Sequence, residues 1–165
     1  MIQALVDEDN DVILEIINSA ASAAYKGVIP ADCWKEPYMP REELLEEVAA
    51  GVRFWGYRAA GQLAGVMGRQ DLGEVVLIRH AYTLPAYQRQ GIGGKLLAHL
   101  RRGATKPILV GTWAAAWWAI RFYQHHGFRL VTPAEKDRLL TTYWSISLRQ
   151  TETSVVLVDE KWGER

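Results

Sequence analysis

The sequence predicts an α/β fold, an α+β arrangement in which about seven strands form one mixed sheet flanked by helices. Short apolar β-like runs recur along the chain, helical stretches with apolar residues three and four apart separate them, and a strand–helix–strand unit lies in the middle. The length of 165 residues suits one compact domain, and no repeat or linker divides the chain. We therefore expect a single domain over residues 1–165.

The N-terminal part begins with a β-like run at 2–6, followed by acidic residues that can cap a helix. Ile13, Ile16 and Ile17 then recur at helical spacing, which predicts a first helix with one buried stripe that ends near Ala24. Residues 25–40 contain three prolines and no period, so they are expected to form a loop. A second helix is predicted from 41 to 51.

The middle of the chain predicts a hairpin and then a crossover unit. The β-like runs at 52–58 and 63–69 are joined by a connection short enough for an antiparallel hairpin. A further strand at 74–84 ends at Pro85, a helix follows at 92–102, and another strand at 107–113. Such a crossover makes its two strands parallel and brings the helix N-terminus to the sheet edge where ligands commonly bind.

The C-terminal part predicts two more helices and two more strands. A helix at 117–126 is stopped by Gly127, and a strand follows at 128–131. Thr132, Pro133 and Glu135 resemble a capping box with proline in the first turn, which opens a helix that reaches about Trp144. The apolar run at 154–158 completes the predicted sheet.

Composition narrows the range of partners. Nineteen basic and nineteen acidic residues cancel, so no overall positive field favours nucleic acid or an anionic membrane. The longest apolar run is far shorter than the roughly 20 residues that span a bilayer. The lone Cys33 cannot form an internal disulfide, the start of the chain does not resemble a secretory signal, and no residues have metal-ligand spacing. We therefore expect a cytoplasmic protein without a metal, with a small molecule or peptide as its partner.

A glycine-rich turn lies between the strand at 74–84 and the helix at 92–102. It contains Gly91, Gly93 and Gly94, flanked by Arg89 and Lys95. Free N–H groups and the helix dipole favour an anion there, and glycine lets the backbone approach phosphate oxygens closely. Neither a Walker A loop nor a dinucleotide fingerprint fits the spacing. The turn predicts a pyrophosphate-like ligand, with a purely structural connection as the alternative.

Two segments resemble a known family. Residues 84–93 are similar to motif A of the GNAT acetyltransferases, Q/R-x-x-G-x-G/A, which begins here at Gln88. Residues 119–128 are similar to the family's motif B, in which a tyrosine, here Tyr123, stands four residues before Gly-Phe. The chain departs from the family at Ala116, where many members carry asparagine, and its helical stretch before the last strand is longer than the family minimum.

The resemblance implies a cofactor site and a general acid. The backbone of the strand that precedes the turn would pair with the pantetheine arm of acetyl-CoA, and the amides of the turn would hold the pyrophosphate. Tyr123 would donate a proton to the departing thiolate. The residues expected at the cofactor are Tyr82, Thr83, Leu84, Gln88, Arg89, Gln90, Gly91, Ile92, Gly93, Gly94, Lys95 and Phe122.

A general base is harder to assign from the sequence. His80 lies on the strand before the glycine turn with the parity of Tyr82, and some family members place a base on this strand. Glu74 is the alternative base, a water relay is a third option, and His80 could instead be a core histidine. The base therefore stays open between His80 and Glu74.

The function implied is that of an N-acetyltransferase acting on a primary amine of a small molecule or peptide, by direct attack on acetyl-CoA. The alternative is a non-catalytic acyl-CoA-binding sensor or regulatory domain. In this family the region at 25–40 usually shapes the acceptor pocket, and its aromatic residues suggest a partly apolar acceptor. Dimers are frequent in the family, so a homodimer is an option beside a monomer.

Overall fold

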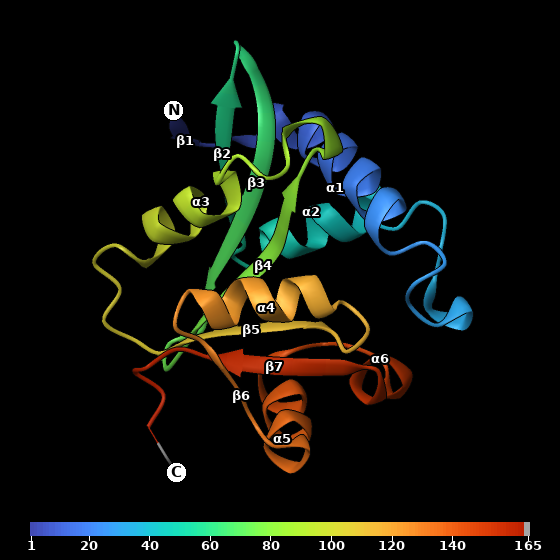
Figure 1. The fold of residues 1–165 in the computed structure, drawn as a ribbon, viewed down its shortest axis with the longest axis vertical. Helices are drawn as coiled ribbons and strands as arrows, with labels where there is room; N and C mark the ends of the chain where they lie inside the picture. Colours follow the sequence, from blue (N-terminus) through green and yellow to red (C-terminus); the bar gives the residue numbers. More distant parts are fainter. Residues whose placement is uncertain (164–165) are drawn as a thin grey trace.

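The computed structural model describes residues 1–163 and contains one seven-stranded mixed sheet with the strand order β1-β2-β3-β4-β5-β7-β6. All neighbouring strands pair antiparallel except β4 and β5, which are parallel. All seven strands therefore belong to one sheet, with β1 at one edge and β6 at the other (Figure 1). Its strands are β1 (Ile2–Ala4), β2 (Arg53–Ala59), β3 (Gln62–Asp71), β4 (Val76–Thr83), β5 (Ile108–Trp113), β6 (Arg129–Leu130) and β7 (Ser154–Val158).

Helices cover both faces of this sheet. The α-helices are α1 (Asn10–Ala24), α2 (Arg41–Ala49), α3 (Ile92–Arg101), α4 (Trp117–His125), α5 (Pro133–Tyr143) and α6 (Leu148–Glu152), with short 3₁₀ turns η1 (Asp7–Asp9), η2 (Ala31–Cys33) and η3 (Pro85–Tyr87). Within residues 1–163, no helix combines the length and apolar character needed to cross a membrane. The same residues contain no group of His, Cys, Asp and Glu arranged to hold a metal ion.

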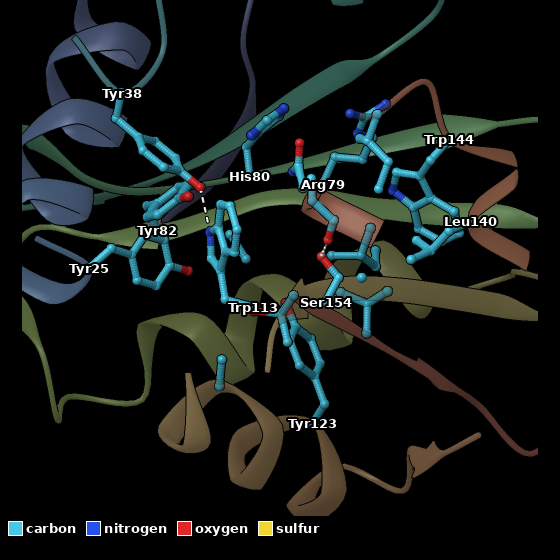
Figure 2. A pocket seen from close by; sticks show the side chains of 18 residues that line it. Tyr25, Tyr38, Arg79, His80, Tyr82, Trp113, Tyr123, Leu140, Trp144 and Ser154 are labelled. Carbon is cyan, nitrogen blue, oxygen red and sulfur yellow. Dashed lines mark hydrogen bonds between the residues drawn. The ribbon is translucent and has the colours of Figure 1, made fainter. Parts of the chain in front are cut away.

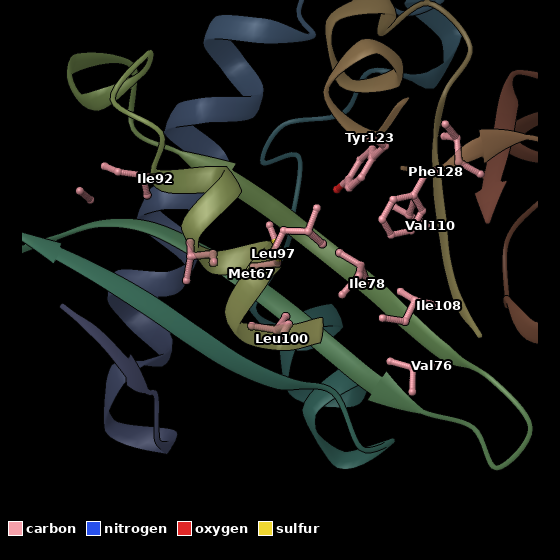
Figure 3. Close-up of a cluster of buried hydrophobic side chains, with 13 residues drawn as sticks. Met67, Val76, Ile78, Ile92, Leu97, Leu100, Ile108, Val110, Tyr123 and Phe128 are labelled. Carbon is pink, nitrogen blue, oxygen red and sulfur yellow. The ribbon is translucent and has the colours of Figure 1, made fainter. Parts of the chain in front are cut away.

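The apolar side chains divide into cores on the two faces of the sheet. On one face, α3 and α4 pack Leu96, Leu97 and Tyr123 against strand residues such as Ile78 and Val110 (Figure 3). On the other face, α1 and α2 cover β2 and β3, and α5 covers β5 and β7. The protein is therefore a three-layer structure, with α3 and α4 on the face opposite α1, α2 and α5.

Local sequence signals account for most of these elements. The predicted hairpin forms between β2 and β3, and its two loop residues, Ala60 and Gly61, have φ angles of 50° and 82°. Thr132 caps α5 by accepting a hydrogen bond from the Glu135 amide, as predicted. The sequence did not predict α6, whose five residues carry too little helical period to be distinguished from a loop.

Candidate active site

The parallel strands β4 and β5 separate halfway along their length. They pair only at Val76–Ile108, Leu77–Leu109 and Ile78–Val110, although β4 continues to Thr83 and β5 to Trp113. The far edge of β5 stays paired with β7 as far as Trp113. A wedge-shaped opening therefore forms in the middle of the sheet, beside the carboxyl ends of the two parallel strands, where open α/β sheets place their ligands.

A β-bulge at His80 changes which side chains face which layer. Met67 on β3 stands opposite two residues of β4, and His80 adopts a φ of 54°, which is uncommon outside glycine. Before the bulge the even-numbered Ile78 packs on the α3 face, whereas after it the even-numbered Tyr82 packs with α1 and α2. Alternation alone would put His80 and Tyr82 on the α3 face with Ile78, so the bulge is what turns their predicted common face toward α1 and α2.

The opening between the strands holds a cavity of about 140 Å³, here named the wedge cavity. Figure 2 shows Tyr123 pointing into it from α4, with Tyr25, Tyr38 and Tyr82 gathered on one side. Its walls come from both halves of the chain and comprise Tyr25, Tyr38, Ile78, Arg79, His80, Ala81, Tyr82, Val110, Gly111, Thr112, Trp113, Ala119, Tyr123, Leu140, Trp144, Ile146, Gln150 and Ser154.

Tyr123 lies between this cavity and a second one. Its side chain is 4% exposed, and its ring makes edge contacts with Phe122 and Phe128. Burial raises the pKa of the Tyr123 phenol, and the nearby Tyr25 raises it further. The phenol therefore keeps its proton at neutral pH and can donate it into the cavities that the ring lines.

His80 belongs to a partly buried polar cluster that reaches across to α2. Its Nε2 lies 2.7 Å from Oε1 of Glu47, and Nη2 of Arg79 lies 2.9 Å from the same oxygen. Burial alone would raise the pKa of Glu47, but the hydrogen bond from His80 and the charges of His80 and Arg79 outweigh it, so the pKa is lowered. An ionised carboxylate only accepts, so Nε2 of His80 donates to it and Nδ1 is the nitrogen left to take up a proton.

The glycine turn forms the opening of α3 as predicted. Gly91 is the N-cap residue in a left-handed conformation, with φ of 76°, and Arg89 beside it also has a positive φ, 65°. No side chain caps this helix, so its first amides are free to bind an anion, which the helix dipole also favours. A Cβ added at Gly91 would meet nothing within 4 Å, so the cap faces open space.

A groove of about 380 Å³ starts at this turn and ends at Tyr123. We name it the glycine-turn groove; it shares Tyr25, Ala81, Tyr82, Ala119 and Tyr123 with the wedge cavity. It therefore leads from the uncapped N-terminus of α3 to the opening between the strands. Its walls are Ala20, Ala24, Tyr25, Val66, Met67, Ala81, Tyr82, Thr83, Tyr87, Gln88, Arg89, Gly91, Ile92, Gly93, Gly94, Leu96, Trp118, Ala119, Phe122 and Tyr123.

Most residues expected at the cofactor line this groove, but three do not. Leu84 packs under α1, and its amide donates to the carbonyl of Ala64 at 2.8 Å. Lys95 points to the β2 side, with Nζ 3.4 Å from the Tyr57 hydroxyl, and Gln90 is exposed outside the lining. The structure therefore does not bring the Lys95 charge to the groove, and Arg89 is the cationic side chain there.

Two of the glycines also serve helix packing. A Cβ on Gly93 would lie 3.3 Å from the Phe122 ring, and one on Gly94 would lie 3.2 Å from the His126 ring. Both contacts are tighter than ordinary van der Waals distance, so α3 and α4 approach closely because these positions lack a side chain. Phe122 thereby becomes a wall of the groove.

A tyrosine cluster on the α1 side joins Tyr82, which the sequence analysis expected at the cofactor, to Tyr25 and Tyr38 of the loop expected to shape the acceptor pocket. Tyr25 lies 5.6 Å from Tyr38 and 6.1 Å from Tyr82, measured between ring centroids, and Trp113 Nε1 donates to the Tyr38 hydroxyl at 2.7 Å. Burial raises the pKa of Tyr38 to about 12 and that of Tyr82 well above its usual value. The aromatic content of the 25–40 region could be read from the sequence. Which rings contact each other could not.

Glu74, the alternative base, is not brought to the site. It lies exposed in the turn between β3 and β4, at the opposite end of β4 from Thr83. Its Oε2 accepts a hydrogen bond from the Tyr143 hydroxyl at 3.1 Å, and it lines neither the wedge cavity nor the glycine-turn groove. Of the two bases considered, only His80 faces the wedge cavity.

The sequence and the fold were also compared with those of known proteins. Residues 50–130 match the family model "Acetyltransferase (GNAT) domain". The PaiA N-acetyltransferase from Thermoplasma acidophilum, solved in complex with coenzyme A, has a TM-score of 0.72 at 18% identity, over 96% of this chain and 97% of that one. The ribosomal-protein-S18-alanine N-acetyltransferase from Escherichia coli has a TM-score of 0.69 at 18% identity, over 100% of this chain and 96% of that one. No curated protein sequence matches this chain. At such identities the solved structures establish a shared fold.

Proposed function

Because the chain carries a GNAT acetyltransferase domain and has the fold of that superfamily, we propose that it is an N-acetyltransferase that moves the acetyl group of acetyl-CoA to a primary amine of a small molecule or peptide. One observation carries the proposal. The glycine-turn groove and the wedge cavity meet at Tyr123, with an anion-binding helix N-terminus at one end and a histidine–carboxylate pair at the other. Such an arrangement can hold two substrates and serve both proton transfers between them.

The glycine-turn groove fits the phosphate and pantetheine parts of acetyl-CoA. The free amides at the start of α3 and the guanidinium of Arg89 would hold the pyrophosphate. Met67 and Phe122 line the groove near Tyr123, and their apolar surfaces suit the hydrocarbon parts of the pantetheine arm. When bound, acetyl-CoA supplies an activated acyl group as a thioester.

Tyr123 is proposed as the general acid. In the transfer, the bond between the acyl carbon and the amine nitrogen forms, and the bond between that carbon and the sulfur breaks. The departing sulfur takes the phenolic proton of Tyr123, which burial has kept in place. Its position at the junction of the two cavities puts this proton where both substrates would meet.

His80 is proposed to accept the proton that the attacking ammonium must lose, directly or through a water. Its Nδ1 is the free acceptor, and Glu47 holds the ring through Nε2 and balances the positive charge that develops. This is the arrangement of a base oriented by a carboxylate, as in other histidine-dependent enzymes. Glu47 acts through His80 and is therefore a positioning residue.

Replacing His80 with alanine is expected to lower kcat/KM about 10²-fold near pH 7, the usual contribution of a general base. The deficit should shrink as the pH approaches the ammonium pKa of about 10, because the free amine then needs no base. Rates of thiol release for wild type and variant, measured from pH 6.5 to 10, test this. An equal deficit at every pH would mean that His80 only supports the structure.

The competing function is a sensor that binds acyl-CoA without turnover. Calorimetric titration with acetyl-CoA, followed in the same sample by thiol release across a panel of amines, separates the two. Micromolar binding with release supports the enzyme, binding without any release favours the sensor, and no binding removes both. A cytoplasmic location and a homodimer both stay predictions.

A further inference from the structure

A third cavity, which we name the outer chamber, adjoins the wedge cavity on the α2 side. Its volume is about 410 Å³, within the range of small-molecule sites. Tyr38, Arg79, His80 and Trp113 line both the outer chamber and the wedge cavity. A molecule in the outer chamber would therefore reach the wedge cavity past His80, whereas acetyl-CoA would reach it through the glycine-turn groove.

The C-terminal helical region forms one side of the outer chamber. Ser145, Ile146 and Gln150, from the connection after α5 and from α6, form one of its walls. This region is attached to η2 by Arg149, whose Nε and Nη2 donate to the two carboxylate oxygens of Asp32 at 2.8 and 3.2 Å. Both side chains are about half exposed, so this pair contributes little stability but defines how the two segments meet. The longer C-terminal region thus confines the space for an acceptor.

The side chains that line the outer chamber carry more negative than positive charge. Glu43, Glu46 and Glu47 line it together with only two permanent cations, Lys35 and Arg79. Lys35 is bound to Glu43 and Arg79 to Glu47, each at 2.9 Å. Among the described residues Glu46 has no ion pair, so a cation entering here meets a free carboxylate. An entering carboxylate, in contrast, meets repulsion and no unpaired cation.

Apolar and aromatic side chains form part of the chamber's remaining surface, beside the polar Gln70, Ser145 and Gln150. Tyr38, Met39, Trp113 and Ile146 line it, and Tyr38 stacks on Trp34 with centroids 5.6 Å apart. These surfaces favour a flat or apolar body and offer aromatic faces to a cation. The chamber therefore combines an apolar wall with a negative charge.

We propose that the acceptor is a small organic ammonium ion with an apolar body and no carboxylate beside its amine, bound in the outer chamber with its amine toward His80. This inference rests on the proposed acetyltransferase function and names its acceptor class. The negative charge disfavours free amino acids, and the volume of about 410 Å³ favours a small molecule over a protein N-terminus.

A matched set of acceptors tests whether the negative charge of the chamber selects against a carboxylate beside the amine. Phenethylamine, phenylalaninamide and phenylalanine share one ring and differ only in carrying hydrogen, a neutral amide or a carboxylate beside the amine. We expect kcat/KM for the first two to exceed that for phenylalanine at least about tenfold, a difference of 1.4 kcal/mol. Equal rates for all three, or equally low rates for the amide and the acid, would overturn the charge argument, and turnover confined to peptide N-termini would overturn the size argument.

Two variants of α2 test whether the preference for a cationic acceptor arises in the outer chamber. Glu46→Gln should raise KM for phenethylamine about fivefold, as expected for one partly screened charge, with acetyl-CoA affinity unchanged. Glu42→Gln removes the same charge from the same helix outside the chamber and should leave KM unchanged. Equal KM values for wild type and Glu46→Gln would contradict the assigned chamber. Absence of thiol release with every amine, despite acetyl-CoA binding, would instead count against the proposed enzyme itself, so the two failures are distinguishable.

Discussion

Replacing Tyr123 with phenylalanine is expected to lower kcat about 10²-fold or more, while the affinity for acetyl-CoA stays nearly unchanged. The substitution removes only the hydroxyl group. The ring keeps its edge contacts with Phe122 and Phe128, so the core around α4 stays packed. The thiolate then has to leave without a proton from the protein, which is the step that the variant slows. Single-turnover acetyl transfer and calorimetric titration with acetyl-CoA measure the two quantities separately.

A matched control for this variant is Tyr57→Phe. Tyr57 lies on β2, and its hydroxyl accepts only a long 3.4 Å hydrogen bond from Lys95, outside both the wedge cavity and the glycine-turn groove. This control should keep wild-type turnover. If Tyr123→Phe also keeps it, another group protonates the sulfur and Tyr123 belongs only to the core.

The second large effect is expected at Gly91. Gly91→Val places a β-branched residue at a φ of 76° and adds a side chain at the mouth of the glycine-turn groove. A strained backbone of this kind costs about 1–3 kcal/mol, and the added methyl groups also hinder a phosphate from approaching the free amides. We expect the Kd for coenzyme A, measured by calorimetry, to rise about tenfold or more.

Gly61→Val separates backbone strain from ligand binding. Gly61 has a similar φ of 82° in the exposed loop between β2 and β3, and an added Cβ there also meets nothing within 4 Å. Both variants should lower the midpoint of thermal unfolding by comparable amounts, but only Gly91→Val should weaken coenzyme A binding. Wild-type affinity in a folded Gly91→Val protein would refute the assigned phosphate site.

Some expected positions show where local reasoning was incomplete. The glycine turn was placed correctly at the start of α3, yet Lys95 turns toward Tyr57 and leaves the groove, while Gly94 makes room for His126 of α4. In both cases an element far away in the sequence decides the outcome, since Tyr57 is the partner of the Lys95 side chain and His126 fills the space that a side chain at position 94 would need. The helical period of α3 alone could place these residues on a face but not select their partners.

By itself the sequence determined the order of the seven strands along the chain, the β2–β3 hairpin, the cap of α5, the glycine turn and the helical position of Tyr123. These features depend on turns, caps and periodicity, which act over a few residues and are therefore readable locally. Only the tertiary structure decided that β4 and β5 separate, that a bulge turns His80 toward α2, and that Glu47, 33 residues away, holds its ring. The same is true of the Tyr38–Trp113 contact across 75 residues. Such contacts depend on how remote segments pack together, and no local pattern of residue types encodes that.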